Sequence, residues 1–193
     1  MQKIATAPNL TRALSVCRIL LGFASVGPVI IYPLMKRVTN WPQLVLGLTI
    51  NWGALVGASS IVGSCPWEYC LPLYLGSVGW TMTYDTIYAH QDKVDDRKVG
   101  VKSTALLLGD YTKPALFVWS GAFVTGLGLA GQAAGMGIPY YIGVTGAAMH
   151  LTWQIVDVDL SEPKDCMAKF VANRWVGAIY FGGIVVDKLM QLS

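Results

Sequence analysis

The chain has 193 residues, of which 54% are hydrophobic and 13% are charged, and its formal net charge is +3. Soluble domains carry about 25% charged residues, so this chain lacks the charged shell that a soluble domain needs. The apolar content excludes a disordered chain, and the small net charge without a basic stripe excludes a nucleic-acid-binding domain. The class that remains is an integral membrane protein.

Six apolar runs are long enough, or nearly long enough, to cross a bilayer, which takes ~20 residues of α-helix. In chain order they cover residues 15–34, 41–62, 70–89, 113–134, 138–156 and 173–186. The runs are apolar throughout and do not alternate, which argues against a β-barrel. Glycines such as Gly126 and Gly143 predict close packing between helices. We therefore predict an all-α fold, a polytopic transmembrane helix bundle.

Basic residues are distributed unevenly between the two sides that six crossings would create. Of the 14 lysines and arginines, 10 fall on one side, in the stretches 36–37, 93–113 and 164–174, and four fall on the other. The positive-inside rule places the richer side in the cytoplasm or, for an organelle of bacterial descent, in the matrix. The N-terminus is basic and free of acids, which is consistent with either a mitochondrial transit peptide or a short juxtamembrane tail.

Acidic residues cluster where the third run leaves the membrane. Asp85, Asp92, Asp95 and Asp96 are four of only 11 acids. In a continuous helix, at ~100° per residue, Asp85, Asp92 and Asp96 would lie within about 40° of one another. Carboxylates this close repel each other unless a cation lies among them, and Mg²⁺ binds proteins through one or two carboxylates plus substrate phosphates. The spacing makes Asp92 and Asp96 a candidate metal site, and Asp85 strengthens it because it lies deeper, beside an apolar run; the alternative is a solvated helix end.

Basic residues follow this acidic cluster directly, at Arg97, Lys98 and Lys102. Carboxylates that hold a metal, followed by cations that contact phosphate, form the combination that a diphosphate requires. A second acid-bearing stretch at 157–165 is expected to be a solvated loop.

Two long segments resemble the UbiA family of intramembrane prenyltransferases, and within it the mitochondrial branch that acts on 4-hydroxybenzoate. The first segment reads YDTIYA at 84–89, DKVDD at 92–96 and VGVKSTA at 99–105, and is similar to the family's second aspartate motif. The second segment reads YPLMKR at 32–37, WPQL at 41–44 and LGL at 46–48. The resemblance covers residues 29–193, an incomplete UbiA-like transmembrane domain, whereas residues 1–28 form a divergent, partly membrane-embedded segment.

The resemblance implies a bundle of nine helices around a central cavity, with two aspartate motifs facing each other at its mouth. The six runs then correspond to about six of these nine helices, the fourth to the ninth. The first motif, of the form N-D-x-x-D, does not occur in the 193 residues. We therefore expect a shortened isoform or a partial gene model, with little or no turnover by the isolated chain.

The resemblance also implies roles for individual residues. It assigns Asp92 and Asp96 to Mg²⁺ and catalysis, and Asp85 and Tyr88 to the catalytic cavity near the acceptor. It assigns substrate binding, through the diphosphate, to Lys36, Arg37 and Lys102.

The implied reaction is transfer of a polyprenyl group from polyprenyl diphosphate to the ring of 4-hydroxybenzoate in ubiquinone biosynthesis. The implied setting is the mitochondrial inner membrane, with the acidic loop facing the matrix. Membrane lipid and other ubiquinone-biosynthesis proteins are the expected partners, without nucleic acid. Two alternatives stand beside this enzyme: a non-catalytic membrane protein from a shortened transcript, and a small transporter. The transporter is disfavoured because no inverted repeat is visible.

Overall fold

The computed structural model describes residues 19–62 and 66–192, and its regular elements there are all helices. A helical stretch over residues 19–24 leads through a turn at Ser25 into the first labelled helix. The long helices are α2 (Val26–Val38), α3 (Pro42–Ile50), α4 (Trp52–Val62), α5 (Trp67–Gln91), α8 (Thr112–Ala133), α9 (Ile138–Asp157) and α10 (Pro163–Leu192). Three short elements lie between α5 and α8: α6 (Lys93–Val99), α7 (Thr104–Leu108) and the 3-10 turn η1 (Gly109–Tyr111).

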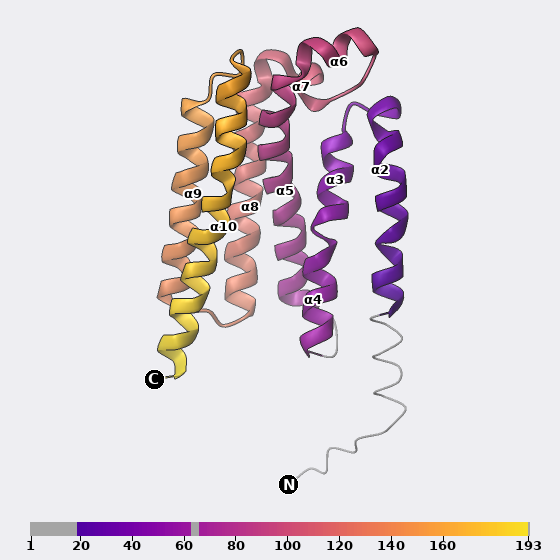
Figure 1. The fold of residues 1–193 in the computed structure, drawn as a ribbon. Helices are drawn as coiled ribbons and strands as arrows, with labels where there is room; N and C mark the ends of the chain where they lie inside the picture. Colours follow the sequence, from indigo (N-terminus) through magenta and orange to yellow (C-terminus); the bar gives the residue numbers. More distant parts are fainter. Residues whose placement is uncertain (1–18, 63–65, 193) are drawn as a thin grey trace.

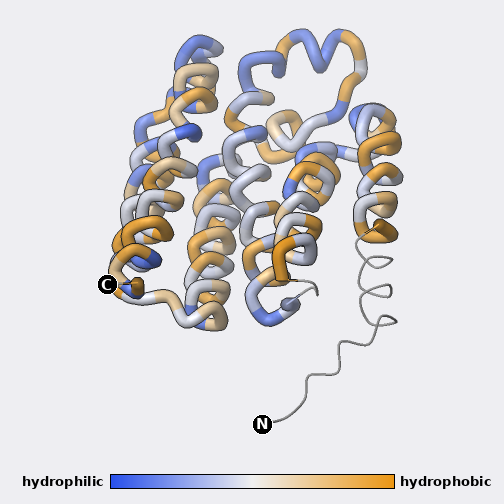
Figure 2. The backbone as a smooth tube through the Cα atoms, turned by 60° about the horizontal axis from the view of Figure 1, so that its bottom comes forward, coloured by the Kyte–Doolittle hydropathy of each residue, from blue (hydrophilic) through white to orange (hydrophobic). Residues whose placement is uncertain are grey.

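The long helices run side by side, except that α4 continues α3 end to end, and successive passes through the bundle alternate in direction (Figure 1). Helix α5 lies between two groups. On one side of α5 lie α8, α9 and α10, and on the other lie α3, α4 and α2. The short helices α6 and α7 lie across one end. Hydrophobic stretches follow the shafts of the helices, and hydrophilic stretches gather toward their ends (Figure 2). The predicted all-α helix bundle is confirmed.

Three helical stretches in the described part are long and apolar enough to cross a membrane by length and composition: Ile19–Val38, Pro42–Val62 and Thr104–Ala133. They match three of the predicted runs. Part of the first predicted run, residues 15–18, lies outside the described residues.

The last helix is much longer than the apolar run at 173–186 indicated, since α10 has 30 residues. Its first turns carry Asp165 and Lys169, whose charges lower the hydropathy of the segment. The Lys169 side chain is only 8% exposed and is paired with Asp157 of α9 and, at 3.3 Å, with Asp165. Lys169 Nζ also lies 4.8 Å from the centre of the Trp153 ring. The predicted solvated loop is therefore partly wrong, because two of its acids hold α10 against α9.

The second apolar run divides at Asn51 into α3 and α4. Asn51 Nδ2 donates hydrogen bonds of 2.8 Å to the carbonyl of Gly47 and to Thr81 Oγ1 on α5. A polar side chain in an apolar helix is stabilised by such a bond to a neighbouring helix. Asn51 therefore fastens α3 to α5 at the point where the helix changes direction.

Close approach through glycine joins α5 to α8 and α9 to α10, as the composition predicted. A Cβ added to Gly126 would lie 2.5 Å from the Pro72 carbonyl oxygen and 2.8 Å from Gly76 Cα. A Cβ added to Gly143 would lie 2.9 Å from Gly183 Cα. Because both obstacles are backbone atoms, the helices would have to separate to admit a side chain.

We expect Gly126→Ala to destabilise the bundle by about 1–3 kcal/mol, the usual cost of overpacking. Gly128→Ala is the matched control, because a Cβ at Gly128 of the same helix meets no atom within 4 Å. Reversible unfolding in detergent micelles measures both. Equal stability of the two variants would contradict the close packing of α5 on α8.

Candidate active site

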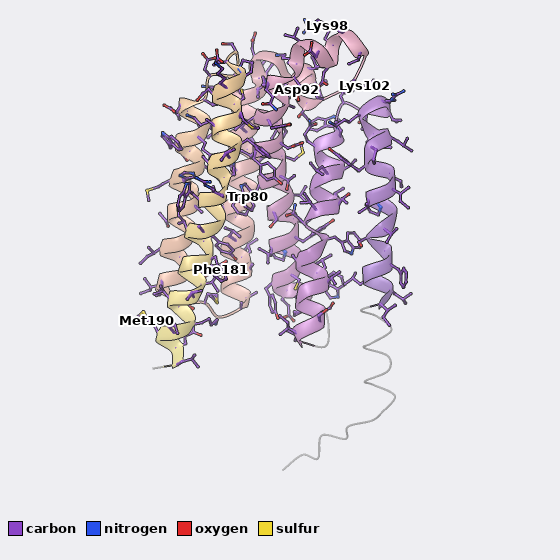
Figure 3. All side chains as sticks on the ribbon, in the orientation of Figure 1. Trp80, Asp92, Lys98, Lys102, Phe181 and Met190 are labelled. Carbon is purple, nitrogen blue, oxygen red and sulfur yellow. The ribbon has the colours of Figure 1, made fainter. Side chains whose placement is uncertain are left out.

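A cavity of about 100 Å³ lies at the end of the bundle where α5 turns into α6. It brings together six of the seven predicted site residues, from three separate parts of the chain. The lining residues are Tyr32, Lys36, Gln43, Asp85, Tyr88, Ala89, Asp92, Asp96, Val101, Lys102 and Ser103. Figure 3 shows Asp92 and Lys102 at this end, with Trp80 halfway along the bundle and Met190 at the far end.

The three carboxylates reach the cavity although the helix between them is broken. Helix α5 ends at Gln91, Asp92 has φ −100° and ψ 2°, and α6 begins at the next residue. The backbone N–H of Asp96 still donates to the Asp92 carbonyl at 2.8 Å, so the helical spacing of these two residues is kept. None of Asp85, Asp92 and Asp96 forms an ion pair with another described residue.

Asp95 is placed differently from its neighbours. It does not line the cavity, and its carboxylate pairs with Lys98 at 2.9 Å on an exposed surface. In the described part of the chain, the three carboxylates at the cavity therefore have no ion-pair partner, whereas Asp95 beside them is paired.

Burial and the charges around the cavity shift the pKa of Asp96. Burial raises the pKa of the Asp96 carboxyl above the ordinary aspartate value, the charge of Lys36 opposes this, and the charges of Asp92 and Asp95 add to it. A cation placed among these carboxylates would stabilise their charged forms.

Two lysines provide positive charge at the same cavity. Lys36 is in the last turn of α2, and its ammonium forms no ion pair with the described residues. Lys102 is tied to α2, because its backbone N–H donates to the Lys36 carbonyl at 2.8 Å and its Nζ donates to the Val38 carbonyl at 3.2 Å. Arg37 is exposed at the end of α2 and is not part of the lining.

The residues 100–104, here called the strap, close one wall of the cavity. Gly100 has φ 71°, a left-handed conformation that suits glycine. The Thr104 N–H donates to Gln43 Oε1 at 3.2 Å, and the Thr104 hydroxyl lies 2.6 Å from the Thr86 hydroxyl. The strap therefore joins α2, α3 and α5 around the cavity.

Aromatic rings extend from the cavity along α5. The Tyr88 ring lies 4.7 Å from the Phe170 ring of α10, and the Tyr84 ring lies 5.7 Å from the same ring, both centre to centre. Trp80 lies 5.7 Å from Tyr84 and stacks on Phe123 at 5.3 Å. The polar cavity thus continues into an aromatic face.

The donor set fits a divalent cation that binds together with a phosphate group. Within residues 19–62 and 66–192, no group of three or more His, Cys, Asp or Glu side chains is arranged to hold a metal alone. Two carboxylates beside two lysines match the way Mg²⁺ is held, through few protein ligands and the oxygens of a bound phosphate.

Sequence reasoning assigned no role to Tyr32, Gln43 or Ser103, which also line the cavity. Tyr32 precedes Lys36 by four residues and so lies on the same side of α2. Gln43 is a buried polar residue after the proline that begins α3. The spacing could have indicated Tyr32, whereas Gln43 and Ser103 depend on how distant segments meet.

The model of the UbiA prenyltransferase family matches residues 10–177, beginning inside the segment that sequence analysis set apart as 1–28. Among the similar curated proteins are the mitochondrial 4-hydroxybenzoate polyprenyltransferases of three organisms. The Drosophila melanogaster protein is 54% identical over 90% of this chain and 44% of its own length, and the Homo sapiens protein is 53% identical over 90% of this chain and 47% of its own length. The Dictyostelium discoideum protein is 46% identical over 98% of this chain and 41% of its own length. The chain spans less than half the length of each.

A solved structure is similar as well. The apo structure of a UbiA homolog from Aeropyrum pernix K1 matches with a TM-score of 0.67 and 25% identity, over 88% of this chain and 63% of the other. The family model covers most of the chain. The solved structure shows that the fold is similar as well. This chain belongs to the UbiA prenyltransferase family.

Proposed function

We propose that this chain provides a metal–diphosphate site of an enzyme that transfers a polyprenyl group from polyprenyl diphosphate to the ring of 4-hydroxybenzoate, in ubiquinone biosynthesis. The observation that carries the proposal is the convergence of Asp85, Asp92 and Asp96 with Lys36 and Lys102 on one cavity. The names and the identity of the curated relatives support the choice of substrates.

In this proposal Asp92 and Asp96 hold Mg²⁺, which when bound neutralises charge on the departing diphosphate. Lys36 and Lys102 bind and orient the phosphate oxygens. The C–O bond to the diphosphate breaks and leaves an allylic cation. The ring carbon ortho to the phenol then forms the new C–C bond, and that carbon loses its proton.

The aromatic face supports this chemistry beside the polar cavity. In this proposal the rings of Tyr84, Tyr88 and Phe170, which lie against one another, border the reacting carbon and exclude water, which would otherwise hydrolyse the cation. Asp85, one helical turn from Tyr88, lies on the acceptor side in this proposal.

We also propose that the protein lies in the mitochondrial inner membrane with α6 and the strap facing the matrix. The 10-to-4 division of basic residues supports this orientation, and the mitochondrial names of the relatives support the organelle. Membrane lipid and other ubiquinone-biosynthesis proteins are the proposed partners.

Inorganic pyrophosphate tests the proposed site without requiring turnover. Titrated into the purified chain in detergent, it should bind in the presence of Mg²⁺ and lose most of its affinity with a chelator. Lys36→Gln should weaken binding, whereas Lys188→Gln, at the opposite end of the bundle, should not. Absence of Mg²⁺-dependent binding by the folded chain would contradict the proposal.

A further inference from the structure

The side chain of Gln43 is divided between two environments. It is 4% exposed, yet it lines the cavity with the carboxylates and the lysines. One end of its amide faces the backbone N–H of Thr104 at 3.2 Å. Because that N–H can only donate, the atom facing it is the oxygen, Oε1. The amide nitrogen, Nε2, is therefore the end that remains for the cavity.

Nε2 of Gln43 donates no hydrogen bond to any described residue, although its partner atom Oε1 is engaged. Among the described residues, Gln154 is the one whose unpartnered side-chain atoms are sealed inside the protein. Gln43 differs because its side chain borders a cavity. Since Gln43 Nε2 is not among the sealed atoms, its two N–H groups face the space of the cavity, where a bound group can accept hydrogen bonds from them.

The surroundings of Nε2 fit an anion that binds together with a divalent cation, because three carboxylates and two lysines line the same cavity. The cavity also contains the ammonium-bearing side chains Lys36 and Lys102. Asp85, Asp92 and Asp96 lie there too, and they accept hydrogen bonds as readily as a phosphate does. No hydrogen bond joins Gln43 to any of these carboxylates in the structure.

We infer that Gln43 binds the substrate's diphosphate through Nε2, as a neutral donor beside the two lysines, while Oε1 keeps the strap in place. The inference rests on the proposed function, since it requires a diphosphate in this cavity. It adds a specificity-determining residue: a planar amide held at its oxygen donates in a fixed direction and so selects the position of one phosphate oxygen more narrowly than a lysine ammonium, whose charge has no fixed direction.

Two substitutions share only the loss of the amide N–H groups. Gln43→Glu keeps an oxygen that accepts from Thr104 N–H but brings a carboxylate toward the anion. Gln43→Met is neutral and similar in size but loses both functions. A hydrogen bond to a charged group is worth about ten-fold or more in affinity. We expect both variants to weaken Mg²⁺-dependent binding of inorganic pyrophosphate by about ten-fold or more.

Two controls separate this role from a structural one. Thr86→Val removes the hydroxyl that lies 2.6 Å from the Thr104 hydroxyl, so it loosens the strap without altering the cavity lining. It should weaken binding less than Gln43→Met does. Gln132→Glu makes the same chemical change at an exposed position near the end of α8 that is far from the cavity, and should leave binding unchanged.

The outcomes distinguish the inference from the proposed function. The unfolding temperature of each variant is measured as well. If Gln43→Met proves unstable, the affinity of Gln43→Glu decides the outcome. If the wild-type chain binds pyrophosphate and Gln43→Glu binds it within two-fold, Gln43 only holds the strap and the inference fails while the function stands. If Thr86→Val loses as much affinity as Gln43→Met, the inference fails in the same way. If the wild-type chain does not bind, both fail.

Discussion

Asp92→Asn and Asp96→Asn should each lower prenyl transfer by about 100-fold or more, because each removes a charge that holds the metal against the departing diphosphate. Asparagine keeps the size of the side chain, so the effect reports charge and not packing. Turnover is measured with this chain fused to the part of the Drosophila melanogaster relative that it does not span. The chain covers 44% of that protein. The rate is followed against Mg²⁺ concentration.

Asp95→Asn is the matched control for these two variants. Asp95 lies in α6 beside Asp96, but its carboxylate pairs with Lys98 outside the cavity, so its replacement should change turnover less than about three-fold, the effect of an exposed ion pair. A solvated helix end would instead give small and similar effects at all three aspartates. If Asp92→Asn and Asp95→Asn reduce the rate equally, the metal assignment is wrong.

Removing both carboxylates around Lys169 should be the most destabilising change outside the cavity. The Lys169 side chain is 8% exposed and is paired with Asp157 and Asp165. The double variant Asp157→Asn with Asp165→Asn would leave a buried ammonium without a counter-charge, which costs about 3–5 kcal/mol. Unfolding in detergent micelles should show this loss.

Adding Lys169→Met to that double variant should restore most of the stability, because an apolar side chain needs no counter-charge in this position. The single variant Asp165→Asn should cost less, since Asp157 remains paired with Lys169. A triple variant as unstable as the double variant would show that the helix ends depend on the acids for another reason.

The helix spans follow largely from hydropathy, because the lipid-facing segments are apolar along their whole length. Hydropathy does not predict the bounds of a helix where charged side chains are paired only in the folded chain. Lys169 and Asp165 lower the hydropathy at the start of α10, and in the folded chain their charges are paired with each other and with Asp157 on α9. The break at Asn51 also depends on a partner on another helix, Thr81.

Residues that line the cavity could be predicted from the sequence when they share a local spacing or belong to a recognised motif. Asp92 and Asp96 share a helical spacing, and the motif resemblance supplied Lys36 and Lys102 from distant segments. Arg37 belongs to the same segment as Lys36, yet it is exposed and does not line the cavity. Gln43 contributes through a contact with Thr104, 61 residues away, and no local pattern indicates that contact.

The most direct test of the proposed activity is the product formed by the fused enzyme. Membranes that contain the fusion are supplied with a polyprenyl diphosphate, 4-hydroxybenzoate and Mg²⁺, and the products are identified by mass spectrometry, with the whole Drosophila melanogaster relative as the positive control. We predict 4-hydroxybenzoate carrying the polyprenyl group on the ring carbon next to the hydroxyl, formed at a rate that saturates with Mg²⁺ and stops with a chelator. A folded fusion that yields no such product, in an assay where the relative does, would contradict the proposal.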